Sequence, residues 1–496
     1  MSMQKRLGSS AAWMSLSASS MSIVSFIVFI IISRLLSPDE IGLVVFSLLI
    51  VETGKILING GLSISIVQRK DWGDDYASTC FYLSLLYGIF ITGLVLLLGV
   101  PLTKTLYAPA AASILQVLSI IFMLEAIKVI PDGKLRREMQ FKTIAIRSIS
   151  SSIISSVIGV YLALKGYGVW ALVAQQLCSQ TIVTLLTLIG AHWRPQKYFS
   201  SIRAREALRL SSPMVLAQTI NTLCVSLVEF MVGIILGPIA LGIYRVAGRA
   251  LFVMQEIIIR PLEQTTIPVL ARMETQFAKA QATLRILRLN CFVILPVFFG
   301  TAAIAEDFIA LVFGEKWHSS GELMSWLALG SAPLAIRMQV NATLTAESKS
   351  HWVLINMLCT LFITLLTGYL LIPYGIIYAA IAYVVINYIS GIVSLLLFQH
   401  IFRCGLVNIF NVLWPSHLTA GIMFGICLLV KNTLPETLPT ILSIIIIGIT
   451  GAISYVLLGA LIFRNETRNF LQECMGLLPK GLSPLLQRIQ FLMRFN

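Results

Sequence analysis

Charged residues are scarce in this chain. Only 12% of its 496 residues are Asp, Glu, Lys or Arg, and 57% are hydrophobic. An average soluble domain has about a quarter of its residues charged. Apolar runs recur from one end of the sequence to the other, and about 20 such residues cross ~30 Å of hydrocarbon as a helix. The sequence therefore predicts an all-α membrane protein with many transmembrane helices.

Patterned cysteine and histidine are also absent. None of the eight cysteines forms a Cys-x-x-Cys pair, and most lie inside apolar runs, where Cys behaves as a small hydrophobic side chain. The five histidines show no metal-ligand spacing. We therefore expect no disulfide framework, no metal site and no resident cofactor.

Motifs for nucleotide hydrolysis and for catalysis are missing as well. The phosphate-binding pattern Gly-x-x-x-x-Gly-Lys-Ser/Thr does not occur, which argues against ATP hydrolysis by this chain. A membrane glycosyltransferase or polymerase would need acidic residues on a sizeable outer loop. Only 305–322 is a candidate, with Glu306, Asp307, Glu315 and Glu322, and it is short. We therefore expect a transporter rather than an enzyme.

The apolar segments number about fourteen, and an even number places both termini on the same side. The first is longer than the apolar core of a signal peptide, so we expect it to be retained. The predicted spans are 12–32, 41–66, 76–100, 113–131, 144–164, 169–190, 213–236, 241–267, 286–304, 323–343, 352–372, 377–400, 414–430 and 439–463.

Basic residues are distributed unequally between the two sides. With the N-terminus inside, 25 of the 36 Lys and Arg residues lie on the cytoplasmic side and 5 on the other. Positive charge favours the cytoplasmic side of a membrane protein. The sequence thus predicts cytoplasmic termini, and it explains most of the net charge of +14 without nucleic acid as a partner.

Two turn motifs occur twice at nearly the same offset. "LSPDEIG" (36–42) and "LGPIALG" (236–242) each separate two apolar runs, as do "GYGVWALVA" (166–174) and "PYGIIYAAIA" (373–382). Proline ends a helix, and glycine permits the turn that follows. The pattern predicts two six-helix lobes in parallel repeat around a central cavity, a plan that some transporters use. Chance matching of short turns is the alternative.

This interpretation divides the chain into five parts. They are an N-terminal lobe (1–190), a cytoplasmic linker (191–212), a C-terminal lobe (213–400), two extra transmembrane helices (401–463) and a cytoplasmic tail (464–496).

The segment 241–267 carries several charges within the predicted membrane. At about 100° per residue these charges fall within about 60° of one another. Charges inside a bilayer are costly and usually face protein or a water-filled cavity. A polar stripe is therefore predicted at Arg245, Arg249, Glu256, Arg260 and Glu263.

Further charges lie in other predicted spans. Glu52 with Lys55, and Glu125 with Lys128, have i,i+3 spacing and could simply neutralise each other. Glu229 lies in the predicted span 213–236 and Arg337 in the predicted span 323–343. Arginine offers a bidentate fork to phosphate oxygens. We expect substrate binding at Arg245, Arg249, Lys55, Lys128, Arg337 and Arg260, and proton or Na⁺ coupling at Glu229, Glu256, Glu52 and Glu125.

Several stretches resemble the Wzx-type polysaccharide flippases of the multidrug/oligosaccharidyl-lipid/polysaccharide (MOP) exporter superfamily, the colanic-acid branch most closely. They cover both halves of the chain, and none is a catalytic signature. The stretches are "ISRLLSPDEIGLVVFSLLI" (32–50), "GLSISIVQRKD" (61–71), "RREMQFKTIAIRSISSSI" (136–153), "GYGVWALVAQQL" (166–177) and "LVFGEKW" (311–317).

The resemblance implies a bacterial inner-membrane flippase. Its substrate would be an undecaprenyl-diphosphate-linked oligosaccharide, moved from the cytoplasmic to the periplasmic leaflet by alternating access, with a polymerase and a chain-length regulator as candidate partners. A small-molecule or drug antiporter of the MATE type, on the same fold, is the alternative. Such an antiporter would favour a cavity rich in acids and aromatics, whereas arginines dominate the stripe in 241–267.

Overall fold

The computed structural model describes residues 22–59, 61–69, 73–435 and 437–462, and within these ranges it contains helices and no strand. The chain forms two compact units. Unit 1 comprises Met1–Glu256 with Thr360–Ala382, and unit 2 comprises Ile257–Cys359 with Tyr383–Asn496. The expected tail at 464–496 and the first part of the first span lie outside the described residues. The division into lobes at 1–190 and 213–400 stays a prediction.

The helices follow the predicted spans closely. They are Ser22–Leu35, α2 (Pro38–Asn59), α3 (Leu62–Gln68), α4 (Asp74–Leu94), the π-helix η1 (Val95–Gly99), α5 (Val100–Leu106), α6 (Pro109–Leu118), α7 (Ile120–Arg137), α8 (Phe141–Leu164), α9 (Val169–Ala191), α10 (Ser201–Ala271), α11 (Gln276–Phe313), the 3₁₀ helix η2 (Glu315–Trp317), α12 (His318–Ser331), α13 (Leu334–Ala346), α14 (Ser350–Leu371), the 3₁₀ helix η3 (Ile372–Tyr374), α15 (Ile376–Phe402), α16 (Leu406–Thr433) and α17 (Thr440–Ile462).

Eleven helical stretches among the described residues are long and apolar enough to cross a membrane. The stretch in α10 covers the two predicted spans 213–236 and 241–267. Gly237 lies between them and interrupts the helix, with φ 86° and ψ −175°. The predicted span 323–343 is divided into α12 and α13, with Pro333 directly before α13. The described part of the first span is the short helix Ser22–Leu35. The predicted fold class, an all-α protein with many membrane helices, is confirmed.

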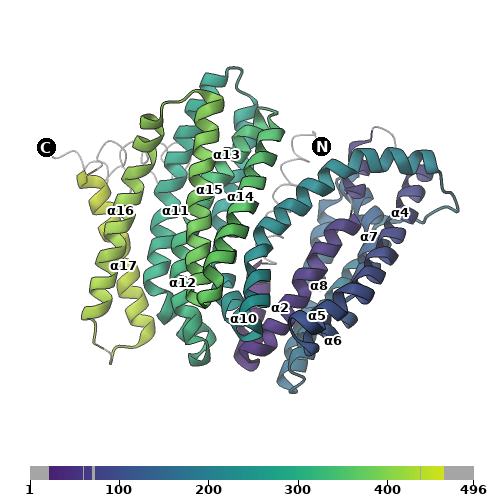
Figure 1. Cartoon of the computed structure of the whole chain (residues 1–496), viewed down its shortest axis with the longest axis horizontal. Coiled ribbons are helices and arrows are strands. Elements are labelled where there is room, and N and C mark those ends of the chain that lie inside the picture. The colour runs from purple at the N-terminus through teal and green to yellow at the C-terminus, as the bar shows by residue number, and fades with distance from the viewer. Residues whose placement is uncertain (1–21, 60, 70–72, 436, 463–496) are drawn as a thin grey trace. The chain divides into compact units, whose positions relative to one another are not determined.

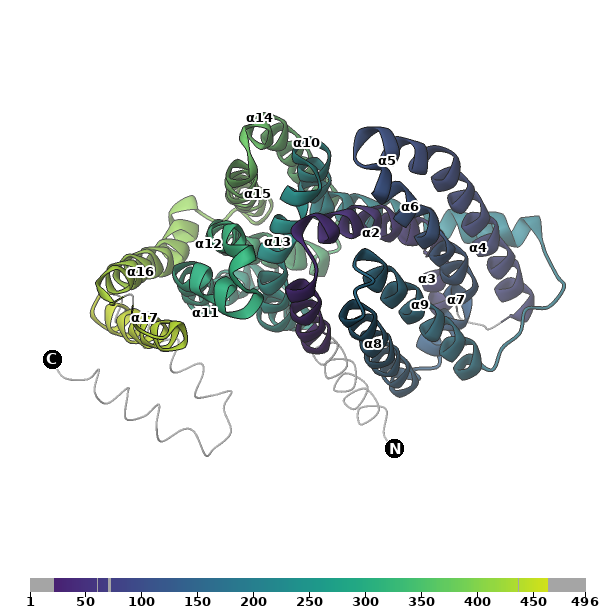
Figure 2. The ribbon, with the colours of Figure 1, turned by 90° about the horizontal axis from the view of Figure 1, so that it is seen from below.

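In unit 1 the helices α2, α3, α4, α6, α7 and α9 contribute side chains to a shared apolar core (Figures 1 and 2). α8 lies along α9, and α7 contacts both α4 and α9. Phe122, Ile58 and Leu115 are fully buried in this core. The first turn of α2 is fixed by a reciprocal cap, since the Ser37 N–H donates to Glu40 Oε2 (2.8 Å) and the Glu40 N–H donates to Ser37 Oγ (3.3 Å). "SPDE" is therefore a helix start.

The two copies of the Leu-x-Pro-x-x-x-Gly motif contact each other in unit 1. A Cβ built on Gly42 would lie 1.9 Å from the carbonyl oxygen of Pro238, and a Cβ built on Gly242 would lie 1.9 Å from that of Pro38. Each glycine thus admits the backbone of the other copy. No side chain fits there, because real Cβ atoms do not approach a backbone oxygen so closely. We call this reciprocal contact the Gly–Pro crossing.

Unit 2 is built around the long helix α11, against which α12, α16 and α17 pack. The apolar core includes Leu287, Leu295 and Met423. The Tyr455 hydroxyl on α17 donates to the Phe292 carbonyl oxygen at 3.0 Å, so the last helix is fixed to α11 by a polar contact as well. Figure 1 shows α16 and α17 side by side, and they lie within the part predicted as two extra transmembrane helices (401–463).

Candidate functional site

Arg245 forms an ion pair with Glu229 inside unit 1. Arg245 Nη1 lies 2.8 Å from Glu229 Oε1 and 2.9 Å from Oε2. Residues sixteen positions apart would be separated by roughly 24 Å in a straight helix. The contact therefore requires the chain to reverse at Gly237, so that the two halves of α10 face each other. Sequence analysis predicted both residues as functional, but not that they pair.

Arg249 lies one turn beyond Arg245 and has a different environment. Its Nη2 donates to Ser25 Oγ at 2.6 Å, and its guanidinium carbon lies 5.7 Å from the Phe29 ring and 5.6 Å from the Phe252 ring. The Nε of Arg249 is buried and has no hydrogen-bond partner among the described residues. Among the described residues no carboxylate forms an ion pair with this side chain. Arg249 is thus a partly buried cation whose Nε–H remains available, within the described part of the chain, to donate a hydrogen bond.

The residues around Arg249 were not anticipated from the sequence. Ser25 and Phe29 belong to the helix Ser22–Leu35, and the Ser25–Arg249 contact joins residues 224 positions apart. A serine and a phenylalanine in an apolar helix carry no signal that distinguishes them from packing residues. Only the fold brings them to the arginine.

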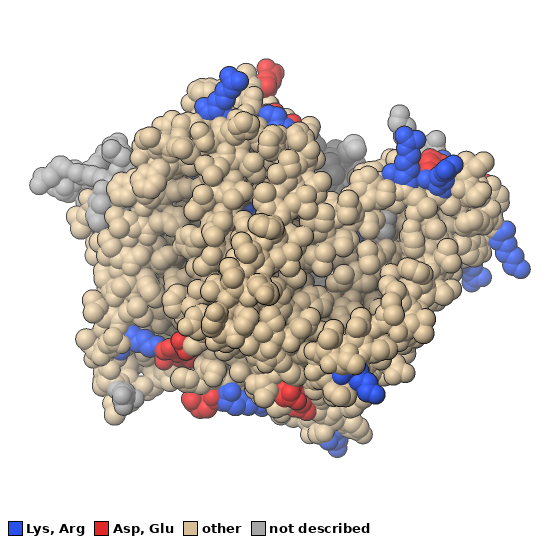
Figure 3. All heavy atoms as spheres, in the orientation of Figure 1, with Lys and Arg blue, Asp and Glu red and all other residues tan. Residues whose placement is uncertain are grey.

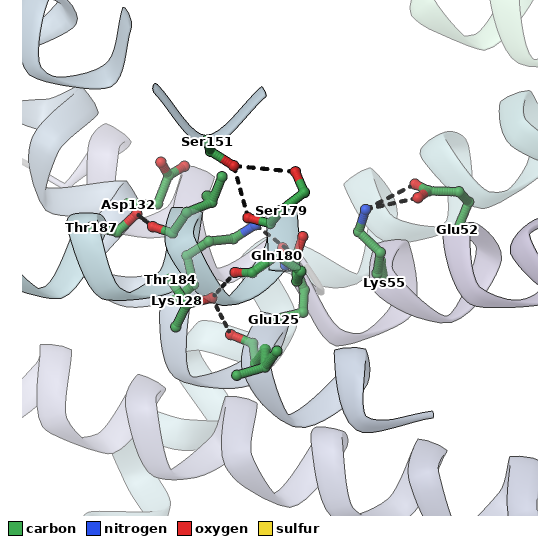
Figure 4. A network of polar contacts seen from close by, with 12 residues as sticks. Glu52, Lys55, Glu125, Lys128, Asp132, Ser151, Ser179, Gln180, Thr184 and Thr187 are labelled. Carbon is green, nitrogen blue, oxygen red and sulfur yellow. Dashed lines mark hydrogen bonds and ion pairs between the residues drawn. The ribbon is translucent and has the colours of Figure 1, made fainter. Parts of the chain in front are cut away.

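The two i,i+3 pairs in the spans are ion pairs (Figure 4). Lys55 Nζ lies 2.8 Å from Glu52 Oε1, and Lys128 Nζ lies 2.8 Å from Glu125 Oε2. The Gln180 side-chain amide donates to the same Glu125 oxygen at 2.7 Å. The Glu125 pair is buried, with 7% of the Glu125 side chain exposed, whereas 58% of the Glu52 side chain is exposed. Each lysine therefore neutralises the glutamate three positions before it, which is the alternative to substrate binding given above.

A third ionic cluster joins α7, α8 and α9. Asp132 accepts from Arg147 through one oxygen and from Arg136 Nε through the other, the latter at 2.7 Å. Arg147 Nη1 also donates to Thr187 Oγ1 at 2.5 Å. The predicted spans left Asp132 and Arg136 in a loop and placed Arg147 near the start of the span 144–164. The i,i+4 spacing of Asp132 and Arg136 was the available signal.

The remaining predicted residues are divided between the units. Glu256 is the last residue of the first segment of unit 1, whereas Arg260 and Arg337 belong to unit 2. Arg260 is exposed and Arg337 is half-buried. The side chain of Glu263 lies outside the described residues. Among the described residues of unit 1, three pairs of predicted residues form ion pairs, and Arg249 has no carboxylate within ion-pair distance.

No group of His, Cys, Asp and Glu that could hold a metal ion occurs in the ranges that the structure describes. The cations and carboxylates above are suited to bind an anion and to exchange a proton or a monovalent cation.

The helical architecture has a counterpart among solved membrane-protein structures. It matches the solved structure of the lipid II flippase MurJ in an inward closed conformation with a TM-score of 0.75, at 13% identity, covering 91% of this chain and 98% of that one. At this identity the likeness establishes the fold alone. The chain is a multi-pass membrane protein of this fold class.

Sequence comparison then gives the family. The succinoglycan biosynthesis transport protein ExoT of Rhizobium meliloti (strain 1021) is 24% identical over 331 residues, 66% of this chain and 67% of the relative. The lipopolysaccharide biosynthesis protein WzxC of Escherichia coli (strain K12) is 24% identical over 365 residues, 70% of this chain and 72% of the relative. A sequence model of the polysaccharide biosynthesis protein family matches residues 31–322. The chain belongs to this family, and the predicted kinship with Wzx-type flippases of the MOP superfamily is confirmed.

Proposed function

We propose that this protein moves an undecaprenyl-diphosphate-linked oligosaccharide from the cytoplasmic to the periplasmic leaflet of a bacterial inner membrane. In this proposal the cavity between the two lobes opens alternately to the two sides of the membrane. The diphosphate binds to cationic side chains in that cavity, and the polyprenyl chain stays in lipid. Both termini lie in the cytoplasm. A polymerase and a chain-length regulator act on the delivered repeat unit.

One observation carries the proposal: Arg249 is a partly buried arginine whose buried Nε–H has no acceptor among the residues that the structure describes. Leaving such a donor unpaired costs free energy, which an incoming anion would recover. The fork of a guanidinium matches phosphate oxygens. A cationic drug at the same position would be repelled, so the geometry does not favour the antiporter alternative.

The test is binding of undecaprenyl diphosphate by purified full-length protein in nanodiscs. A charge-assisted hydrogen bond contributes about 1.5–3 kcal/mol, so we expect Arg249→Gln to weaken binding by about 10- to 100-fold. Arg249→Lys keeps the charge without the fork and should lose less. The matched control is Lys104→Gln, which removes an exposed cation in unit 1. Unchanged affinity in Arg249→Gln would contradict the proposed role.

Glu229 is our candidate for ion coupling, ahead of Glu256, Glu52 and Glu125. It holds Arg245, so a substrate diphosphate and the Glu229 carboxylate compete for the same guanidinium. Protonation of Glu229, or Na⁺ binding to it, would release Arg245 to the substrate.

We therefore expect Glu229→Gln to bind the diphosphate at least as tightly as the wild type and to lose any dependence of transport on a proton or Na⁺ gradient. Flipping in proteoliposomes under imposed gradients measures this. A gradient dependence that survives in Glu229→Gln would assign coupling to another carboxylate.

A further inference from the structure

The segment between α9 and α10 is firmly fixed to unit 1. Trp193 Nε1 donates to Asp74 Oδ1 at 3.0 Å, the Gln196 N–H to Ser78 Oγ at 2.9 Å, and the Ser200 N–H to Thr79 Oγ1 at 3.3 Å. Arg203 Nη1 forms an ion pair with Asp75 Oδ2 at 3.0 Å. The segment expected to be a cytoplasmic linker therefore has one side committed to α4.

The opposite side of the segment exposes large apolar side chains. Tyr198 is 39% exposed, Phe199 56% and Ile202 80%. The backbone on either side of Tyr198 and Phe199 is held by the contacts with α4, and Ile202 lies in the first turn of α10. The segment thus presents two aromatic rings and an isoleucine outward in a fixed position.

The same surface carries four exposed basic side chains. None of them forms an ion pair with a described acidic residue, whereas Glu206, the only acidic residue between 194 and 209, pairs with Arg69 at 3.2 Å. Figure 3 shows Lys and Arg gathered at the corner of the surface over the start of α4 and α10. We define the linker patch as Arg194, Lys197, Tyr198, Phe199, Ile202, Arg205 and Arg209.

The backbone limits where this patch can lie. Residues 193–200 are not helical, and an irregular backbone facing lipid is not tolerated in the hydrocarbon core. Exposed Phe and Ile side chains are in turn unfavourable in bulk water. The headgroup region satisfies both requirements, since aromatic rings and basic side chains concentrate there.

We propose that the linker patch binds anionic phospholipid headgroups of the inner leaflet. The rings and Ile202 insert at the boundary between headgroups and acyl chains. The four basic side chains contact phosphate and other anionic groups of the lipids. The contact fixes the start of α10, the helix that carries Glu229, Arg245 and Arg249, relative to the membrane surface.

Native mass spectrometry of the full-length protein in detergent tests the proposal, with phosphatidylglycerol and phosphatidylcholine as probes. The wild type should retain phosphatidylglycerol in preference. A basic side chain near an anionic surface contributes about 1 kcal/mol, so Arg194→Gln with Lys197→Gln should weaken phosphatidylglycerol binding by about 30-fold and leave phosphatidylcholine unchanged. Lys104→Gln with Lys165→Gln, which also removes two exposed cations, is the matched control and should bind like the wild type.

A charge-preserving variant, Arg194→Lys with Lys197→Arg, should keep the lipid preference and so separates charge from folding. Phe199→Ser with Ile202→Ser should weaken the binding of both lipids. Equal phosphatidylglycerol binding by wild type and the Arg194/Lys197 double Gln variant would overturn the proposal. A wild type that retains the two lipids equally would also overturn it, and would favour a soluble protein as the partner of the patch.

Discussion

At the scale of single residues, charges of the same type on one helix face have different environments. Arg245 and Arg249 lie one turn apart, yet within the described ranges Arg245 has a carboxylate partner and Arg249 has none. Helical periodicity predicted the shared face, because it depends on local geometry alone. It did not predict the partners, since Ser25 and Phe29 reach Arg249 from a distant helix. The i,i+3 pairs could be predicted because both partners lie on one helix. The contacts of Arg249 could not, because its partners lie more than 200 positions away in the sequence.

The Asp132 cluster gives a prediction at this scale. Asp132→Asn leaves the buried Arg147 without its charge partner, and breaking a buried pair costs about 3–5 kcal/mol. Arg136→Gln removes the second ion pair of Asp132. This arginine is half exposed, so we expect the free energy of unfolding to fall by less than about 1 kcal/mol. Thermal unfolding of the detergent-solubilised protein compares the two. An equal loss of stability in the two variants would mean that the buried Arg147–Asp132 ion pair stabilises the protein no more than the exposed Arg136–Asp132 pair does.

At the scale of elements, the Leu-x-Pro-x-x-x-Gly motif marked two helix boundaries correctly, but its last glycine does not form the turn, because Gly42 lies inside α2 and Gly242 inside α10. The Ser37–Glu40 cap begins α2, and Gly237 with Pro238 interrupts α10, both in the motif that the sequence analysis singled out. The same reasoning missed that the predicted span 323–343 is divided into α12 and α13, with Pro333 directly before α13. Apolar periodicity continues across this proline, and the pattern therefore reads as one helix. That the two motif copies touch was also beyond sequence reasoning.

The Gly–Pro crossing makes a prediction about elements. Gly42→Ala or Gly242→Ala places a methyl group where a backbone oxygen already lies, so the helices must separate. Overpacking of this kind costs about 1–3 kcal/mol. Gly93→Ala in α4 is the control, because its Cβ would meet no atom within 4 Å and Ala favours a helix by roughly 0.5–1 kcal/mol over Gly. Unfolding temperatures that fall equally in all three variants would refute the crossing as a tight contact.

At the scale of the whole molecule, composition and span counting predicted the fold class. Long apolar runs and the scarcity of charge are properties of the sequence that a bilayer imposes directly. The relative placement of lobes depends on contacts between distant helices, which such counting does not include. The arrangement around a central cavity accordingly remains a prediction.

The orientation of the whole molecule is testable with single reporter cysteines. We expect Lys165→Cys to react with a membrane-impermeant maleimide in intact cells, and Lys197→Cys to react only after permeabilisation, because basic segments stay inside. Both positions are exposed, so the comparison measures sidedness rather than burial. Parallel labelling of the parent protein corrects for its own thiols. The reverse labelling pattern would invert the proposed topology.

The Gly–Pro crossing also constrains how this sequence can evolve. Each glycine accommodates the proline of the opposite motif, so a side chain gained in one copy requires a compensating shift in the other. Two segments about 200 positions apart are thereby obliged to change together, while the apolar helices around them drift freely. Among descendants of this chain, paired replacements at positions 38, 42, 238 and 242 should outnumber solitary ones.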